Sequence, residues 1–270
     1  MPPVGAHALR PFHVVAVNVN GLSDRGKRRR FFAWLRQQRC DVGLLVETHC
    51  RSSETAQQWV QEGAGPGRPW QGHAFFAHRA CHPADRPTSG VAVLLSPQIV
   101  AADTEPTVVF SDSSEGRLLR VEWTAPWGQR MAAIAVYAPA EAAHRPDFFD
   151  SGYTAALDTG GEGASLIVGG DFNCAMSVAD VQAAAGRDPA SSSRLVGGPE
   201  LRLINDGMGL VDAWRAQHPS QCQPTHYSFG QAVAPAGANS GSRQPAPSTL
   251  ATSAGRIDYV FLSPDLVQGG

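Results

Sequence analysis

Short apolar segments recur along this chain of 270 residues, and polar or turn-forming residues bound each of them. Runs of this length that are rich in β-branched residues are typical of buried strands. They predict strands at 12–17, 42–46, 90–95, 117–123, 131–137, 165–169 and 257–262. Residues 25–39 predict a helix, because Phe31, Trp34, Leu35 and Gln38 share one face and arginines occupy the other. Weaker helical patterns lie at 54–62, 146–158, 176–186 and 198–208.

The order of these segments predicts an α/β protein. Strands and helices alternate, but several strands follow one another without a helix, as in 117–137, which favours mixed sheets over a simple βαβ repeat. The length suits one large domain or two small ones. Residues 230–254 are rich in Gly, Ala, Ser and Pro and have no periodicity, so we expect a long flexible loop before the last strand.

Composition narrows the class of protein. Hydrophobic residues make up 43% of the chain and charged residues 17%, as in globular proteins. No run reaches the roughly 18 apolar residues of a membrane helix, and the N-terminus lacks the apolar core of a signal peptide, so we expect no membrane association and no secretion. Five scattered cysteines, none in a CxxC pair, argue against a disulfide framework or zinc knuckle and favour a reducing compartment.

Charge gives a weaker signal. The formal net charge is −2, so the chain lacks the global basic excess of many nucleic-acid-binding proteins. Its single lysine, Lys27, lies in the basic run 24–32. That run is either a set of phosphate contacts or the solvated face of the first helix.

Polar side chains lie at the ends of several predicted strands. They are Asn18, Asn20, Glu47, Tyr137, Asp171, Asn173 and Asp258. Each alone has a local explanation, such as a turn at Asn18, a helix cap at Glu47, or an ion pair between Asp258 and Arg256. As a set they could converge on one cleft, because ligand sites of open α/β folds lie outside strand ends.

The residue types of this set indicate a chemistry. Oxygen ligands without a Cys or His cluster suit Mg²⁺ or Mn²⁺ rather than zinc. A divalent ion among carboxylates, with amides nearby to orient oxygens, suits hydrolysis of phosphate esters. Negative charge then builds up on the phosphate oxygens, where a cation and hydrogen-bond donors stabilise it. A carboxylate at a strand end can accept the proton of the attacking water.

Eight motifs then make a resemblance specific. In chain order they are "NVNGL", "LLVETH", "SGVAVLL", "VYAP", "GGDFN", "LVDAWR", "HYSF" and "RIDYVFLS". They resemble the successive motifs of the endonuclease/exonuclease/phosphatase superfamily, and are most similar to the apurinic-type endonuclease domain of LINE-type (non-LTR) retrotransposons. The resemblance runs from Phe12 to Ser263, so we expect a tail at 1–11 and one domain at 12–270. It implies a DNase I-like, four-layered α/β sandwich of two mixed β-sheets packed face to face with helices outside.

The resemblance also implies catalytic roles for the strand-end residues. Glu47 would be the main carboxylate ligand of Mg²⁺ or Mn²⁺, with Asn18 beside it and Asp258 helping. Asp171 would orient or deprotonate the attacking water. Asn173 would hold the scissile phosphate and the water in line.

Further residues would contact the substrate. Tyr137 would donate a hydrogen bond to a phosphate oxygen, and Asn20 would contact the nucleic-acid backbone. Ser228 in "HYSF" stands where the family has a phosphate-contacting Thr, although Thr225 is a competing assignment. Arg256, in the "RID" motif, is the remaining candidate for substrate binding.

One family motif is absent from this chain. The family ends with a Ser-Asp-His motif whose imidazole, held by another Asp, supports the transition state, but no histidine follows His226 before Gly270. We therefore expect the last core strand to be missing, one sheet edge to be open, and little or no nuclease activity from residues 1–270. The chain would be either a fragment of a longer protein or a truncated or decayed copy.

The leading functional hypothesis is a metal-dependent DNA endonuclease that nicks target DNA for retrotransposon integration. It implies DNA as partner, a reverse transcriptase following in the full-length protein, and action in the nucleus after synthesis in the cytoplasm. The loop at 230–254 would correspond to the hairpin with which LINE-type nucleases probe the minor groove. Two alternatives stay open: a phosphatase on inositol phosphates or a sphingomyelinase of the same superfamily, or a degenerate copy without catalysis.

Overall fold

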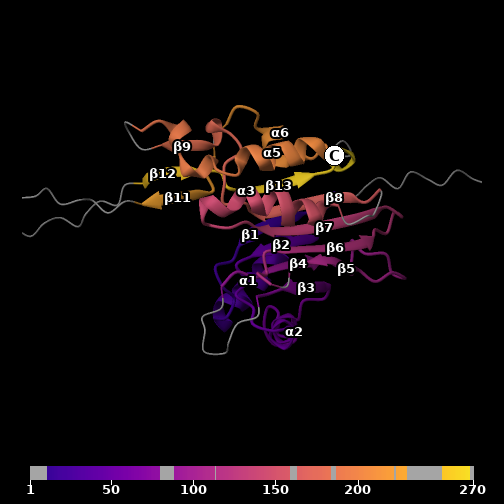
Figure 1. Ribbon diagram of the computed structural model, residues 1–270. Helices are drawn as coiled ribbons and strands as arrows, with labels where there is room; N and C mark the ends of the chain where they lie inside the picture. Colours follow the sequence, from indigo (N-terminus) through magenta and orange to yellow (C-terminus); the bar gives the residue numbers. More distant parts are fainter. Residues whose placement is uncertain are drawn as a thin grey trace, which may run out of the picture.

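Two β-sheets lie face to face in this protein, with helices outside both of them (Figure 1). The computed structural model describes residues 11–79, 88–112, 114–158, 163–183, 187–221, 223–229 and 251–267. These residues form the four layers that the sequence predicts. None of the helices among them is long and apolar enough to cross a membrane.

The first sheet has four strands in the order β1-β2-β4-β3. Their bounds are β1 Val14–Asn18, β2 Val42–Val46, β3 His73–Ala77 and β4 Val91–Leu95. β1 and β2 are parallel, whereas β4 is antiparallel to both of its neighbours. β2 and β4 are buried along their whole length because both faces of this sheet are covered, which explains their unbroken apolar runs.

Two helices cover the outer face of the first sheet. They are α1 (Arg25–Gln37) and α2 (Ser53–Glu62). Phe32 and Leu35 of α1 and Trp59 of α2 are buried together with Leu45 and Leu94 of the sheet. Each helix starts with a side-chain cap, since Asp24 and Ser52 accept hydrogen bonds from backbone amides of the first turns.

The second sheet has six strands in the order β10-β13-β8-β7-β6-β5. Their bounds are β5 Thr107–Ser111, β6 Leu118–Thr124, β7 Arg130–Tyr137, β8 Ser165–Asp171, β10 Val211–Asp212 and β13 Asp258–Leu262. Only β7 and β8 are parallel. Its outer face packs against α3 (Arg145–Phe148), a π-helical turn (Phe149–Tyr153), α4 (Thr154–Leu157) and α5 (Gly198–Gly207).

The facing sides of the two sheets form a core of alternate strand residues. Val42, Leu44 and Val46 of β2 pack against a row that includes Ala133 and Ala135 of β7. The small alanines let β2 and β7 approach closely, which brings the ends of β1 and β2 next to those of β7 and β8. This packing positions the candidate site.

A small third sheet contains β11 (His226–Phe229), β12 (Ala251–Gly255) and β9 (Val181–Ala183). The helix predicted at 176–186 is therefore wrong, because residues 178–180 form a 3₁₀ turn and 181–183 pair with β12. Tertiary contacts override the local pattern here, since the Asp180 carboxylate is held by arginines and Val181 is buried.

The predicted loop at 230–254 is corrected at its end, because residues 251–254 belong to β12. The rest of that segment, 230–250, lies outside the described residues, as does most of the predicted N-terminal tail. Short strands with little apolar character, such as β9 and β12, carried no strand signal in the sequence. The two remaining α-helices of the described residues are α6 (Ala213–Gln217) and α7 (Pro264–Val267).

β1 is an edge strand, since it pairs only with β2 among the described residues. A groove of about 520 Å³ is lined by Val14 and Ala16 of this strand together with Trp214 and Val260. Asp258 also lines this groove.

Candidate active site

One amide joins carboxylates from the two sheets. The Asn18 Nδ2 group, at the end of β1, donates to Glu47 Oε1 at 2.9 Å and to Asp171 Oδ2 at 3.3 Å. Glu47 directly follows β2 and has a φ of +53°, and its carbonyl accepts from the Gly21 amide at 2.7 Å. Glu47 does not cap α2, because Ser52 does. The sheets therefore bring together three residues that are far apart in sequence.

Asp171 and Asn173 form a turn that also faces the cluster. Asp171 Oδ1 accepts from the Asn173 backbone amide at 2.9 Å, and Asn173 Nδ2 donates to the Ala138 carbonyl at 2.8 Å. The preceding Gly170 has a φ of +144°, and a Cβ there would lie 2.0 Å from the Val136 carbonyl oxygen. Glycine is thus required for β8 to reach this turn beside β7.

Strand register places Asp258 and Tyr137 on either side of Asp171. Asp258 begins β13 directly opposite Asp171 at the end of β8. Tyr137 ends β7, which is parallel to β8, and is in register with the same Asp171. The start of β13 and the ends of β8 and β7 therefore place two carboxylates and a phenol on adjacent strands.

Thr225 fixes the start of β13. Its Oγ1 accepts hydrogen bonds from the backbone amides of Ile257 and Asp258, both at 3.1 Å. Of the two alternatives from the sequence, Thr225 thus lies beside the cluster. The backbone of Ser228 belongs to β11, and its side chain lies outside the described residues.

Burial and like charge act on Asp171. Its side chain is almost fully buried, and burial is the main reason that its pKa rises from 3.8 to about 7. The nearby Asp258 and Glu47 carboxylates raise this pKa further. Hydrogen bonds from the Asn173 backbone and from Asn18 oppose the rise.

The pKa values of Asp258 and Tyr137 are raised as well. Burial and then Glu47 raise the pKa of Asp258, whereas its hydrogen bond with Thr225 lowers it. Burial, the charge of Glu47 and a hydrogen bond to Glu47 raise the pKa of Tyr137 well above its usual range. The phenol therefore stays protonated and able to donate.

The residues of this cluster fit a divalent cation with oxygen ligands. The carboxylates of Asp258 and Glu47 raise the pKa of Asp171, and that of Glu47 raises the pKa of Asp258, so a bound cation would relieve this concentration of negative charge. Within the described residues, no three Asp, Glu, His or Cys side chains are grouped closely enough to hold a metal by themselves. Mg²⁺ commonly uses only one or two protein carboxylates and keeps several waters. Glu47, Asn18 and Asp258 would fit such a site.

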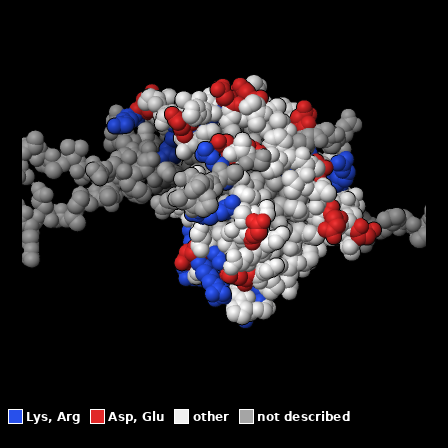
Figure 2. Space-filling model, turned by 60° about the horizontal axis from the view of Figure 1, so that its bottom comes forward, with Lys and Arg blue, Asp and Glu red and all other residues white. Residues whose placement is uncertain are grey.

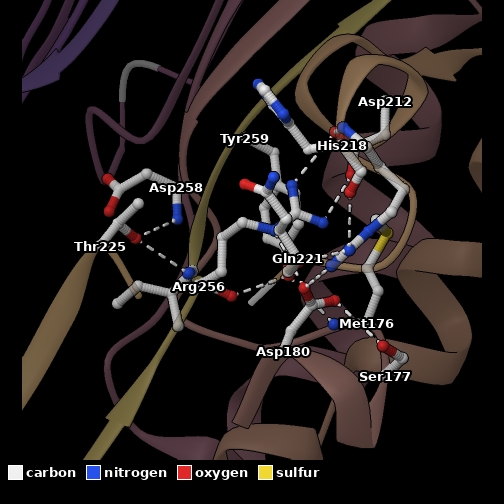
Figure 3. Close-up of polar contacts among 12 residues, drawn as sticks. Met176, Ser177, Asp180, Asp212, His218, Gln221, Thr225, Arg256, Asp258 and Tyr259 are labelled. Carbon is white, nitrogen blue, oxygen red and sulfur yellow. Dashed lines mark hydrogen bonds and ion pairs between the residues drawn. The ribbon is translucent and has the colours of Figure 1, made fainter. Parts of the chain in front are cut away.

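Arg256 lies in a network of ion pairs just before β13, and its contact with substrate stays a prediction. Its guanidinium is buried and pairs with Asp212 at 2.7 Å and with Asp180 at 3.0 Å (Figure 3). The rings of Tyr259 and Trp214 lie 4.3 and 5.0 Å from it. These ion pairs fix the segment before Asp258 against the segments that contain Asp180 and Asp212.

Asn20 lies beside the cluster on the exposed side. Its backbone amide donates to Asn18 Oδ1 at 3.0 Å, and its carbonyl accepts from Lys27 Nζ at 2.7 Å. It lines a hollow of about 380 Å³ together with Lys27, His49 and Arg51. His49 Nε2 also lies 3.7 Å from Glu47 Oε2, a contact that the sequence did not indicate although His49 belongs to the "ETH" motif.

A second residue that the sequence did not indicate is Arg145. Its side chain is buried, and its guanidinium donates to the backbone carbonyls of Pro139, Ala140, Ser193 and Val196. These bonds hold the segment after Ala138, whose carbonyl receives the Asn173 amide. No motif in the sequence signals this role, because its acceptors are backbone groups.

Comparison with known proteins identifies the family of this chain. Residues 15–270 match the Endonuclease/Exonuclease/phosphatase family, so the chain belongs to that family. It is 30% identical over 207 residues to the transposon TX1 uncharacterized 149 kDa protein of Xenopus laevis. That alignment covers 76% of this chain but 14% of the transposon protein, so the chain spans about a seventh of this relative.

Solved structures confirm the four-layered fold. The AP endonuclease LMAP of Leishmania major is similar with a TM-score of 0.63 and 17% identity, over 95% of this chain and 80% of that one. The Xenopus laevis APE2 catalytic domain has a TM-score of 0.60 and 20% identity, over 94% and 83%. An AP endonuclease from Archaeoglobus fulgidus has a TM-score of 0.57 and 17% identity, over 96% and 89%.

Proposed function

We propose that this chain is a divalent-metal-dependent endonuclease domain that cleaves phosphodiester bonds of DNA. The observation that carries the proposal is the convergence of Asn18, Glu47, Asp171 and Asp258 from both sheets at one end of the sandwich. Burying carboxylates close to one another is energetically unfavourable, and such clusters are typical of catalytic sites rather than of binding modules. The family membership and the transposon relative favour a nuclease over the other activities of the superfamily.

The metal ion would be held by Glu47, Asn18 and Asp258. When bound, it supplies positive charge that stabilises the developing charge on the phosphate oxygens. Asn18 also holds Glu47 and Asp171 in place through its amide. Tyr137, kept protonated by its surroundings, donates a hydrogen bond to a phosphate oxygen.

Asp171 would accept the proton of the attacking water. Its pKa of about 7 suits a general base that works near neutral pH, although a bound cation would lower it. The Asn173 backbone amide holds Oδ1 of Asp171 and Asn18 Nδ2 donates to its Oδ2, so both oxygens are fixed in position. The Asn173 side chain, held by its hydrogen bond to the Ala138 carbonyl, would orient the water and the phosphate.

Glu47→Gln tests the proposal, with Glu105→Gln on the exposed surface as the matched control. Supercoiled plasmid is incubated with excess protein in Mg²⁺ or Mn²⁺, and calorimetry measures Mn²⁺ binding in parallel. We expect Mn²⁺ binding and metal-dependent nicking, however slow, in the native chain and in Glu105→Gln, and neither in Glu47→Gln. Nicking that persists in EDTA or in Glu47→Gln would refute the assignment, and hydrolysis of inositol phosphates or sphingomyelin in place of DNA would favour the alternative substrates.

The wider setting belongs to the same proposal. The similarity to a transposon protein supports a role in retrotransposon integration, with action on chromosomal DNA in the nucleus. It also supports a reverse transcriptase domain in the full-length protein. The coding sequence beyond residue 270 tests this, because it should encode a Ser-Asp-His motif and then a polymerase domain.

A further inference from the structure

Helix α1 and the two residues after it concentrate positive charge. Residues 25–39 contain seven of the 22 Lys and Arg residues of the chain and no Asp or Glu, although the whole chain is slightly acidic. They are Arg25, Lys27, Arg28, Arg29, Arg30, Arg36 and Arg39. Figure 2 shows basic side chains gathered at the lower left, on the side where α1 lies in Figure 1.

Only part of this charge is neutralised. Glu62 of α2 pairs with Arg28 at 2.7 Å and with Arg25 at 3.5 Å. Among the described residues, Arg29, Arg30, Arg36 and Arg39 form no ion pair with a carboxylate, and the last three are exposed. The basic run is thus divided into a paired half and an unpaired half.

An exposed indole lies on α1 beside the unpaired Arg30, whereas Arg36, two residues further on, projects from another side of the helix. Trp34 is 39% exposed, so it does not share the buried face of Leu35 as the sequence predicted, and the buried face of α1 is formed by Phe32 and Leu35. Its ring contacts that of Phe31, with centroids 5.9 Å apart, so the indole is supported and its orientation is restricted. Arg30 lies one turn before Trp34 on the same face.

This surface leads away from the candidate active site. α1 starts beside the cluster, where Lys27 Nζ contacts the Asn20 carbonyl, and it returns the chain to the other end of the parallel strands β1 and β2. Its 13 residues span about 20 Å at 1.5 Å per residue. At the far end, Arg36, Arg39 and Trp70 line a separate hollow of about 400 Å³.

We propose that the α1 surface, defined as Arg29, Arg30, Trp34, Arg36 and Arg39, binds single-stranded nucleic acid apart from the cleft. Cations that follow a backbone, together with an aromatic ring on which a base stacks, are the elements of sequence-independent binding to single strands. Duplex bases are already stacked on one another, so an intact duplex cannot use the indole. The arginines bind phosphates and Trp34 stacks on one unpaired base.

Binding of a fluorescent oligothymidylate of about 12 nucleotides tests this. Anisotropy is measured in EDTA with the Glu47→Gln protein as background, so that neither metal nor cleavage is needed and failure of the proposed nuclease leaves this test intact. The charge-reversal variant is Arg30→Glu with Arg36→Glu. Its matched control is Arg202→Glu, an exposed position on α5 on the other side of the sandwich.

We expect the double charge reversal to weaken binding at least about tenfold, and to flatten the salt dependence of log K by about 1.4, since each phosphate contact to a single strand contributes about 0.7. Trp34→Ala should weaken binding about tenfold with the salt dependence unchanged. Arg202→Glu should bind as its parent does. Circular dichroism checks that each variant is folded.

Two results would overturn the proposal. One is that the double charge reversal binds the oligothymidylate as tightly as its parent. The other is that charge reversal weakens an intact duplex as much as the single strand while Trp34→Ala changes neither, because the surface would then be a general polyanion-binding surface. The proposal is supported if the native chain binds the single strand more tightly than the duplex and Trp34→Ala removes this difference.

Discussion

Replacing Asp171 by Asn should stabilise the metal-free protein at neutral and alkaline pH. The folded protein raises the pKa of Asp171 from 3.8 to about 7, so the ionised carboxylate is disfavoured in the folded state. Its contribution to stability is therefore full below pH 3.8 and is lost as the pH rises to about 7. A shift of this size corresponds to a loss of about 4 kcal/mol.

Asn cannot ionise, so the variant avoids this loss. It keeps an oxygen for the Asn173 backbone amide but loses the acceptor for Asn18 Nδ2, which costs about 1 kcal/mol. The net gain expected at pH 8 is about 3 kcal/mol. At pH 4 the gain should vanish, because Asp171 is protonated in the folded native chain.

Urea unfolding in EDTA at pH 4 and pH 8 measures the difference. Asp41→Asn is the matched control: Asp41 is also buried, but it accepts hydrogen bonds from the His13 amide at 3.0 Å and the Ser96 hydroxyl at 2.9 Å. It should be destabilised at pH 8. The reasoning fails if Asp171→Asn is no more stable than the native chain at pH 8, or if its gain is equally large at pH 4.

Three other changes test the packing around the site. Arg256→Met should cost about 3–5 kcal/mol in urea unfolding, because it removes the arginine paired with Asp212 and leaves the buried Asp180 carboxylate with Arg215 alone. Exposed Arg202→Met should change stability by less than about 0.5 kcal/mol. Gly170→Ala should cost about 3 kcal/mol or more in thermal unfolding, while Gly207→Ala, with open space around it, should not destabilise; equal effects would contradict the steric argument. Thr225→Ala should cost about 2 kcal/mol, because it leaves two backbone amides without their acceptor. Thr225→Ser keeps the hydroxyl and should be nearly as stable as the native chain; a loss as large as that of Thr225→Ala would contradict the role of the hydroxyl.

Much of the site could be predicted from local sequence. Apolar runs mark the strands, and the polar residue after each run marks its end, so Asn18, Glu47 and Asp171 were identifiable one by one. The order of eight motifs then indicated the family, which the match over residues 15–270 confirms. Local chemistry is sufficient for this step because a strand end, a turn and a helix cap each involve only a few neighbouring residues.

Only the tertiary structure decided which of these residues meet. The register of β13 against β8 sets Asp258 opposite Asp171, and the packing of the two sheets brings Asn18 to both carboxylates. The same long-range contacts enclose Arg256 and turn residues 181–183 into a strand against their local pattern. The sequence by itself determined which polar side chains the site contains and at which strand end each one lies. The distances between them, their burial and therefore their pKa values depend on contacts between chain segments more than 100 residues apart.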